Sequence, residues 1–336
     1  MIAVLNKFKW FYIVSFIVFG AILTISIWPV EYSLIAPAVN DNIEDVIVVE
    51  SEYNHKGTFH TTSVISLNEI SYLQYFLGTR MKTVSINELP DYYSNVDPKD
   101  IKVMSSLNKD DSIQTSLIVG INEADVTIDF TSYITVFLTY NHMSEDSFVV
   151  GDYIVKVNGS ENIIDEIVAV ECNETASFDI IRDGEAMTVT ASRNEIDDSC
   201  TFGIYIKTYS EILETIADYE IHETSTGGSS GGLMQSLYVY NQLTAFDYSN
   251  GLKIGGTGTI DVEGRVGSIG GIREKIITAI SNDIDIFFVP HLSDNDTDNY
   301  IKALETYNEF DTDMILVGVE TFEEAITYLS EVSADE

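Results

Sequence analysis

Basic residues are scarce in this 336-residue chain. It has 17 Lys and Arg against 54 Asp and Glu, which gives a formal net charge of −37. A nucleic-acid-binding protein needs cations that neutralise phosphates, so this balance disfavours nucleic acid as a partner. The hydrophobic content of 45% is nevertheless far above that of a disordered acidic chain. The sequence therefore predicts a folded protein with a strongly acidic surface.

Two functional signals are also missing from the sequence. No G-x-x-x-x-G-K-[ST] phosphate loop occurs, so we expect no ATPase module and no bound nucleotide. The five histidines show no paired metal-binding spacing such as H-E-x-x-H, which disfavours a zinc hydrolase. Residues 294–305 match the acidic positions of a calcium loop, but Asn299 replaces the glycine of its sharp turn. We therefore expect a helix capped at Asp296 or Asp298 there, and neither a metal nor a cofactor.

Residues 10–30 contain no charged side chain. At about 1.5 Å per residue, a helix of this length covers about 31 Å, which is enough to cross a bilayer core. Lys7 and Lys9 precede the run and Glu31 follows it, so the positive-inside rule places residues 1–9 in the cytoplasm. We expect a single-pass protein of the cell membrane, with a cytoplasmic N-terminus and all later residues outside.

A retained anchor is favoured over a cleaved signal peptide, because the apolar run is long and the small residues at 36–38 lie well beyond it. Since residues 1–30 hold two lysines and no acid, the remainder of the protein is two charges more negative than the whole, at −39. The same topology would expose Cys172 and Cys200 to an oxidising compartment. The sequence leaves open whether these two cysteines form a disulfide.

The pattern of apolar residues predicts an α+β fold. In the N-terminal part we expect residues 46–49 and 58–65 to pair as strands, and Asp97 with Pro98 to start a helix. Later segments are expected to form strands at residues 116–121, 125–130, 133–138 and 202–206, a helix at 210–219, and a buried strand at 284–289 that ends at Pro290.

A strand-like segment at residues 151–159 reads G-D-Y-I-V-K-V-N-G, and an Asp183-Gly184 turn joins two alternating runs further on. Asp-Gly between such runs is a strong hairpin signal. This succession resembles a PDZ domain of the bacterial protease-associated kind, spanning residues 122–196. The resemblance implies that an extended peptide adds to the domain as an edge strand. It assigns the peptide-binding segment to Tyr133, Ile134, Thr135 and Val136.

A glycine-rich turn at residues 226–232 reads T-G-G-S-S-G-G and opens an apolar helix. A serine in such a turn can be an exposed nucleophile, with the helix N-terminus ready to hold an oxyanion. A second block, G-T-G-T-I-D-V-E-G-R-V-G-S-I-G-G-I-R-E-K, follows at residues 256–275. The order and spacing of the two blocks are more specific than either block alone.

Together these two blocks resemble the proteolytic domain of Lon-type serine proteases. The family pattern is G-P-S-A-G, then T-G-x-I-x-x-x-G-x-V-x-x-I-G-G-[LI]-x-x-K, then a strand that ends in proline. We expect this domain at residues 197–336, with residues 31–121 supplying its first strands and a helix, and with the PDZ domain inserted. With its N-terminal span, the protein is similar to the membrane-anchored PDZ-Lon proteases of Gram-positive cell surfaces. Some members of that group process secreted peptide pheromones.

The resemblance assigns the nucleophile to Ser230 and the general base to Lys275, with the Thr257 hydroxyl orienting the lysine. At residues 228–232 the segment G-S-S-G-G replaces G-P-S-A-G, so Ser229 stands at the proline position and competes for the role of nucleophile. We assign Ser230 because the Gly-Leu-Met that follows then stays in register. Gly231 replaces the alanine, and a turn with more glycine and no proline is expected to be looser and less active.

In a serine–lysine pair the lysine must be neutral near pH 7. Its pKa must therefore lie well below the usual lysine value of about 10.4. A negative surface potential favours the ammonium form, so we expect Lys275 to be buried away from the acidic surface. The apolar neighbours Ile269, Ile272 and Ile276 are consistent with burial. His222 is the alternative base, but no acidic partner for it can be assigned from the sequence.

The sequence therefore predicts an ATP-independent, membrane-anchored serine endopeptidase that cleaves extracytoplasmic peptides or flexible segments, secreted signalling peptides among them. Its expected partners are a peptide or protein substrate and the membrane, without nucleic acid or nucleotide. An enzyme without an unfolding motor should not digest stable globular proteins. The alternative from another class is a cell-surface PDZ scaffold that binds peptides with little or no cleavage.

Overall fold

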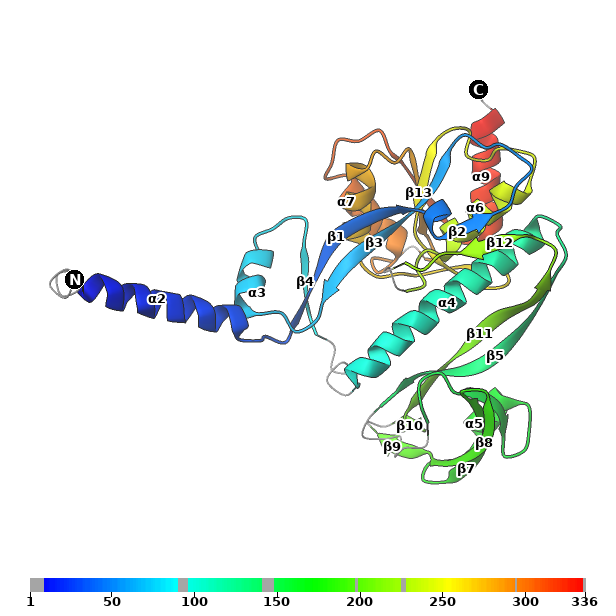
Figure 1. Ribbon diagram of the computed structural model, residues 1–336, viewed down its shortest axis with the longest axis horizontal. Helices are drawn as coiled ribbons and strands as arrows, with labels where there is room; N and C mark the ends of the chain where they lie inside the picture. Colours follow the sequence, from blue (N-terminus) through cyan, green and yellow to red (C-terminus); the bar gives the residue numbers. More distant parts are fainter. Residues whose placement is uncertain are drawn as a thin grey trace.

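The computed structural model describes residues 9–89, 96–140, 148–196, 199–224, 228–293 and 295–334. It consists of a projecting helix, α2 (Lys9–Ile27), and two folded parts (Figure 1). The main body, residues 31–123 and 219–334, is built on a six-stranded sheet. The small body, residues 128–215, is built on a five-stranded sheet and is joined to the main body by a two-stranded ribbon that follows a long helix.

The sheet of the main body has the strand order β17-β16-β13-β3-β1-β4. Its strands are β1 (Tyr32–Asn42), β3 (Thr58–Leu67), β4 (Ser85–Glu88), β13 (Lys253–Gly256), β16 (Ile286–Pro290) and β17 (Ile315–Val319). β3 lies between antiparallel β1 and parallel β13. Segments from the N-terminal third and from the C-terminal third of the protein therefore form one sheet.

Helices cover both faces of this sheet. They are α4 (Pro98–Glu123), α6 (Gly232–Leu243) and α9 (Phe322–Ala334) on one side, and α7 (Ile272–Ser281) and α8 (Asn299–Tyr307) on the other. In β16, Ile286 and Phe288 pack into the core on the α6 side, whereas Phe287 and Val289 pack on the α7 side. Alternate residues of a strand point to opposite faces, so a strand covered twice reads as a continuous apolar run. This is the buried strand that the sequence predicts.

α4 begins where the sequence predicts, at Asp97 and Pro98. The Asp97 carboxylate accepts a hydrogen bond of 2.8 Å from the main-chain N–H of Lys99, and proline is favoured at the first helical position. Residues 116–121, however, continue this helix and do not form the predicted strand. All six are buried, and a short, fully buried apolar run has the same pattern in a helix and in a strand.

Two further predictions from the sequence are wrong. Residues 46–49 do not pair with 58–65, because β2 (Ile47–Val49) pairs with β12 (Tyr219–Ile221) while β3 pairs with β1 and β13. Residues 210–219 do not form a helix, because β11 (Ile204–Thr215) runs through them as the partner of β5 (Ile128–Thr139). In both cases long-range strand pairing overrides a local pattern.

The small body is a sheet in the order β11-β5-β6-β7-β8 with one short helix. Its remaining elements are β6 (Tyr153–Val157), α5 (Ile163–Ala169), β7 (Thr175–Arg182) and β8 (Glu185–Ser192). The rings of Phe148 and Phe202 each meet Phe178 edge to face in its core. Asp183 and Gly184 both have positive φ in the turn between β7 and β8, which confirms the predicted hairpin.

The sheet order corrects two expectations for the small body. Because β11 belongs to its sheet, the body extends beyond the predicted limit at residue 196. The predicted peptide-binding segment, Tyr133 to Val136, lies on β5, an inner strand between β11 and β6. Ile134, Thr135 and Val136 have main-chain partners on both sides. A peptide therefore cannot add to the sheet there, since strand addition needs a free edge.

Cys172 and Cys200 form a disulfide bond, with their Cα atoms 5.6 Å apart. The bond joins the loop after α5 to β10 (Ser199–Thr201), which pairs with β9 (Asn194–Ile196). The Arg193 guanidinium, in the same region, donates to the carbonyl oxygen of Val168 at 2.9 Å, near the end of α5. The disulfide, which the sequence leaves undecided, therefore links two segments at one end of the small body.

α2 is long and apolar enough to cross a membrane, with a mean hydropathy of 2.2, and none of that segment is buried against the rest of the protein. A signal sequence near an N-terminus has the same length and composition, so α2 is a candidate span. Of the predicted cytoplasmic segment, only Lys9 lies within the described residues.

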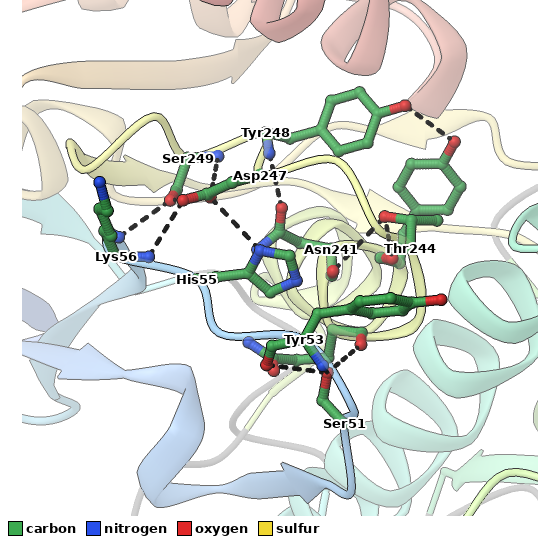
Figure 2. A network of polar contacts seen from close by, with 12 residues as sticks. Ser51, Tyr53, His55, Lys56, Asn241, Thr244, Asp247, Tyr248 and Ser249 are labelled. Carbon is green, nitrogen blue, oxygen red and sulfur yellow. Dashed lines mark hydrogen bonds and ion pairs between the residues drawn. The ribbon is translucent and has the colours of Figure 1, made fainter.

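A polar network fixes the start of β3 to the end of α6 (Figure 2). His55 Nδ1 lies 3.7 Å from Asp247 Oδ1, and the Asp247 carboxylate also accepts from the main-chain N–H of Lys56 at 3.0 Å. On the other side, the Ser51 hydroxyl donates to the Gln242 carbonyl oxygen at 2.6 Å. These contacts hold the loop before β3 against the end of α6 and the segment that follows it.

Candidate active site

The predicted serine turn leads directly into α6. It is described from Gly228, which has a φ of +92° that favours glycine. The carbonyl oxygen of Ser230 accepts from the main-chain N–H of Gly258 at 2.8 Å and from the Thr257 hydroxyl at 3.1 Å. The Ser112 hydroxyl of α4 donates to the Ser229 carbonyl oxygen at 3.1 Å. The turn is therefore held by contacts to its main chain from two other parts of the protein.

Gly258, in the second glycine-rich block, is packed too closely against its neighbours to leave room for a side chain. A Cβ built on Gly258 would lie 2.9 Å from Val266 Cγ1 and 3.4 Å from Leu233 Cβ. Both neighbours are buried core side chains with little room to move. Because Gly258 has no side chain, the main chain of Thr257-Gly258 can pack against the start of α6.

Lys275 lies in α7 with its amine buried next to the serine. Only 2% of the residue is exposed. Lys275 Nζ lies 2.9 Å from Ser230 Oγ and donates a hydrogen bond of 2.5 Å to the carbonyl oxygen of Thr62 in β3. The structure therefore brings together Ser230, from the first predicted block, and Lys275, from the second.

Burial lowers the pKa of Lys275 from 10.5 to about 8, because desolvation disfavours the ammonium form. In the described part of the protein, no carboxylate lies within ion-pair distance of its amine. The adjacent Glu274 is also buried, but its carboxylate accepts from the Ser85 hydroxyl of β4. The amine is thus separated from the acidic groups that would favour its charged form.

Ser230 and Lys275 line a cavity of about 540 Å³. Its wall includes the segment of β3 that follows the end of β13. Gly256, the last residue of β13, pairs with Thr61, and beyond that point β3 continues along β1 with pairs such as Val64 with Pro37. Thr62, Ser63, Val64 and Ile65 all line the cavity. One edge of β3 therefore pairs with β13 as far as Thr61. From Thr62 onward the same edge borders the cavity.

A second cavity, of about 920 Å³, lies on the other side of the serine turn. It is lined by α4, by β11, and by the hairpin of β14 (Thr259–Ile260) and β15 (Val266–Gly267). Ser229 and Thr259 line both cavities. The serine turn thus sits between two hollows with room for an extended peptide on each side.

Several predicted contacts are not present in this site. The Thr257 hydroxyl donates to the Ser230 carbonyl oxygen, so it orients the serine main chain and not the lysine as expected. His222 is not among the residues that line the cavity of Ser230; its ring is about half exposed and faces Glu220 at 3.7 Å. The Ser-His alternative therefore lacks the geometry that proton transfer requires.

Two residues that position the pair were not predicted from the sequence. One is Thr62, whose carbonyl oxygen accepts from the lysine, and the other is Ser112, which holds the serine turn. A main-chain acceptor such as Thr62 leaves no side-chain signature in a sequence. Ser112 is one of several serines in α4, and only the packing of α4 beside α6 distinguishes it.

Within the described ranges, no group of three or more His, Cys, Asp or Glu side chains could hold a metal ion. Asp298 is the N-cap of α8, and its carboxylate accepts from the main-chain N–H groups of Tyr300 and Leu292, both at 2.8 Å. The predicted capped helix is therefore confirmed at Asp298. Asp294, the first position of the calcium-loop pattern, lies outside the described residues.

Comparison with known proteins identifies the region that contains this site. Residues 223–328 match the sequence model of the Lon protease (S16) C-terminal proteolytic domain. A Lon protease of Neorickettsia sennetsu is 26% identical over 105 residues, which is 31% of this protein and 12% of that relative. The match thus covers only a small part of the relative's length. A Lon-type proteolytic domain supports peptidase activity for the segment that holds both Ser230 and Lys275.

We expect Gly258→Ala to destabilise the main body by about 1–3 kcal/mol, because the added Cβ would crowd buried Val266 and Leu233. The matched control is Gly270→Ala, at a glycine of the same block where an added Cβ meets no atom within 4 Å. Urea denaturation of both variants measures the difference. Equal stability of the two variants would show that the close approach at Gly258 is not a constraint.

Proposed function

We propose that this protein is an ATP-independent serine endopeptidase in which Ser230 is the nucleophile and Lys275 the general base. The observation that carries the proposal is the 2.9 Å contact between Lys275 Nζ and Ser230 Oγ inside a cavity large enough for a peptide. The match of residues 223–328 to a Lon proteolytic domain supports it, because both residues fall in that range. Membrane anchoring by α2 is part of the proposal.

The proposed reaction begins with neutral Lys275. Its lone pair accepts the proton of the Ser230 hydroxyl across the 2.9 Å contact, while the Thr62 carbonyl oxygen accepts one N–H and orients the amine. Ser230 Oγ then bonds to the scissile carbonyl carbon, and the C–N bond breaks as the ammonium returns a proton to the leaving amine. Water hydrolyses the resulting ester by the same proton route. The main-chain N–H groups of Gly232 and Leu233 already donate to the oxygens of Ser229 and Gly258, so the oxyanion would be stabilised by N–H groups of the serine turn that precedes α6.

An extended substrate would enter as an added strand on β3. From Ser63 to Ile65 the edge of β3 that lies beyond the end of β13 borders the cavity, so its main-chain groups can pair with a peptide. Such a peptide would pass the Ser230 hydroxyl and continue into the second cavity, since Ser229 and Thr259 line both. This geometry requires an extended backbone, so flexible peptides and exposed loops are the substrates that we propose.

The small body would assist as a peptide-binding module of the PDZ kind, but at a different strand from the one that the sequence suggests. β11 is the edge strand of its sheet. Further along β11, side chains of α4 already accept from this strand, with Ser210 N–H donating to Asp111 at 3.2 Å and Ile212 N–H to Gln114 at 3.1 Å. In a strand, the N–H groups of every second residue point to the same side. The N–H groups of Ile204 and Ile206 therefore point to the same side of β11 as those of Ser210 and Ile212. We propose that this segment accepts the peptide.

The assignment of the nucleophile can be tested with the full-length protein in detergent micelles and a panel of unstructured peptides. Ser230→Ala and Lys275→Ala should each reduce cleavage by about 1,000-fold or more, because either change removes the activated nucleophile. Ser229→Ala is the matched control, since it removes a neighbouring hydroxyl with no part in the proposed proton transfer. Loss of activity in Ser229→Ala alone would contradict the choice of serine. Peptide binding without cleavage by the natural sequence would instead favour a scaffold.

The pH dependence of cleavage tests the role of Lys275. Because the reactive form of a general base is deprotonated, kcat/KM should rise with pH and level off above the lysine pKa of about 8. With that pKa, the rate at pH 6 should be about 100-fold below the plateau. The profile is measured on one unstructured peptide without ionisable side chains. A flat profile between pH 6 and pH 9 would exclude the buried lysine as the base.

A further inference from the structure

The short helix α3 (Tyr72–Gly78) lies at the C-terminal end of the candidate span. Figure 1 shows it across the end of α2, between that helix and β4 of the main body. Main-chain hydrogen bonds of 2.9 Å join the segment that follows α2 to the start of α3, from Val30 N–H to the Ile70 oxygen and from Tyr72 N–H to the Trp28 oxygen. The position of α3 is therefore fixed relative to the end of α2.

Four large apolar side chains are exposed on α3 and the turn that follows it. Tyr72 and Phe76 are four residues apart, and so are Leu77 and Met81, so the two pairs form neighbouring rows along the helix and the turn after it. All four side chains are exposed, and so is Trp28 at the end of α2. The inner face is different, because Gly78 is buried against Ile86 of β4. The exposed apolar groups are thus gathered on the side away from the sheet.

Two basic residues border this apolar surface in a protein that has few. The Arg80 guanidinium lies 3.6 Å from the centre of the Phe76 ring, and Lys82 follows two residues later. Aromatic and aliphatic side chains bordered by Arg and Lys are typical of helices that lie in the headgroup region of a bilayer. A soluble partner with an apolar surface would not explain why these groups occur at the point where the candidate span ends.

We propose that Trp28, Tyr72, Phe76, Leu77 and Met81 form an interfacial patch that inserts into the headgroup region of the bilayer crossed by α2. The inference rests on the membrane anchoring in the proposed function and adds a second contact with the same membrane. Arg80 and Lys82 reach the lipid phosphates, while the acidic remainder of the surface stays in water. One flexible anchor would leave the main body free to tilt, whereas two contacts fix its orientation.

The patch is connected to the helix that carries Lys275. The Arg273 guanidinium of α7 donates to the Lys82 carbonyl oxygen at 3.0 Å, and the Ser85 hydroxyl donates to the Glu274 carboxylate. Arg273 also pairs with Glu309 at 2.8 Å. A membrane contact at α3 would therefore hold α7 and the candidate active site at a fixed height above the bilayer. Peptide segments close to the membrane surface are the substrates that this placement favours.

The test uses the full-length protein in phospholipid vesicles that contain lipids brominated near the headgroup end of the acyl tail. Trp10 and Trp28, the protein's two tryptophans, are replaced by Phe, and Phe76→Trp supplies a single reporter. The matched control is Phe246→Trp, because Phe246 is 48% exposed and Phe76 is 45% exposed. Leu77→Trp provides a second reporter in the patch. Peptide cleavage by each variant verifies that it is folded.

We expect the brominated lipids to quench the Phe76→Trp and Leu77→Trp indoles severalfold more than the Phe246→Trp indole, with a blue-shifted emission for the first two. Flotation of the vesicles reports anchoring separately. A protein that floats with the vesicles but shows equal quenching at positions 76 and 246 would overturn the interfacial patch alone. A protein that does not float would overturn the membrane anchoring, and with it both proposals about the membrane.

Discussion

The candidate active site depends on burial of the Lys275 amine beside the Ser230 hydroxyl. The protein has a net charge of −37, and a negative potential raises the pKa of any lysine that it reaches. Desolvation acts in the opposite direction, and it is the cause that lowers the pKa of Lys275 to about 8. The two faces of the sheet, covered by α6 and α7, provide the interior in which the amine is desolvated.

The site needs residues from well outside the segment that matches known proteins. Residues 223–328 contain the serine turn and the lysine, but the acceptor for the lysine is Thr62 of β3, and the support of the serine turn includes Ser112 of α4. The N-terminal strands also form part of the cavity wall. Residues 31–123 are therefore a structural part of the candidate site, and a fragment restricted to the matched segment would lack the β3 side of its cavity.

The sequence led to Ser230 and Lys275 through its resemblance to the Lon-type motifs, and the structure brings the two side chains to 2.9 Å. The sequence failed where a pattern had two meanings. The apolar pattern of residues 116–121 fits a buried strand as well as a buried helix. Only the packing of the folded protein shows that these residues belong to α4. Residues 210–219 have helical spacing, yet pairing with β5 makes most of them a strand. The peptide-binding edge was misplaced for the same reason, since the partners of β5 are distant in sequence.

Titration of Lys275 is the most direct test of this account. The measurement is the carbon-13 shift of the lysine Cε in the full-length protein as pH rises, with the signal assigned by its absence from Lys275→Arg. If the amine is desolvated as proposed, the midpoint should lie near the pKa of about 8, well below the 10.5 of an ordinary lysine. A midpoint at the ordinary value would mean that the amine is hydrated and charged at neutral pH, and would contradict the proposed role of Lys275 as the base.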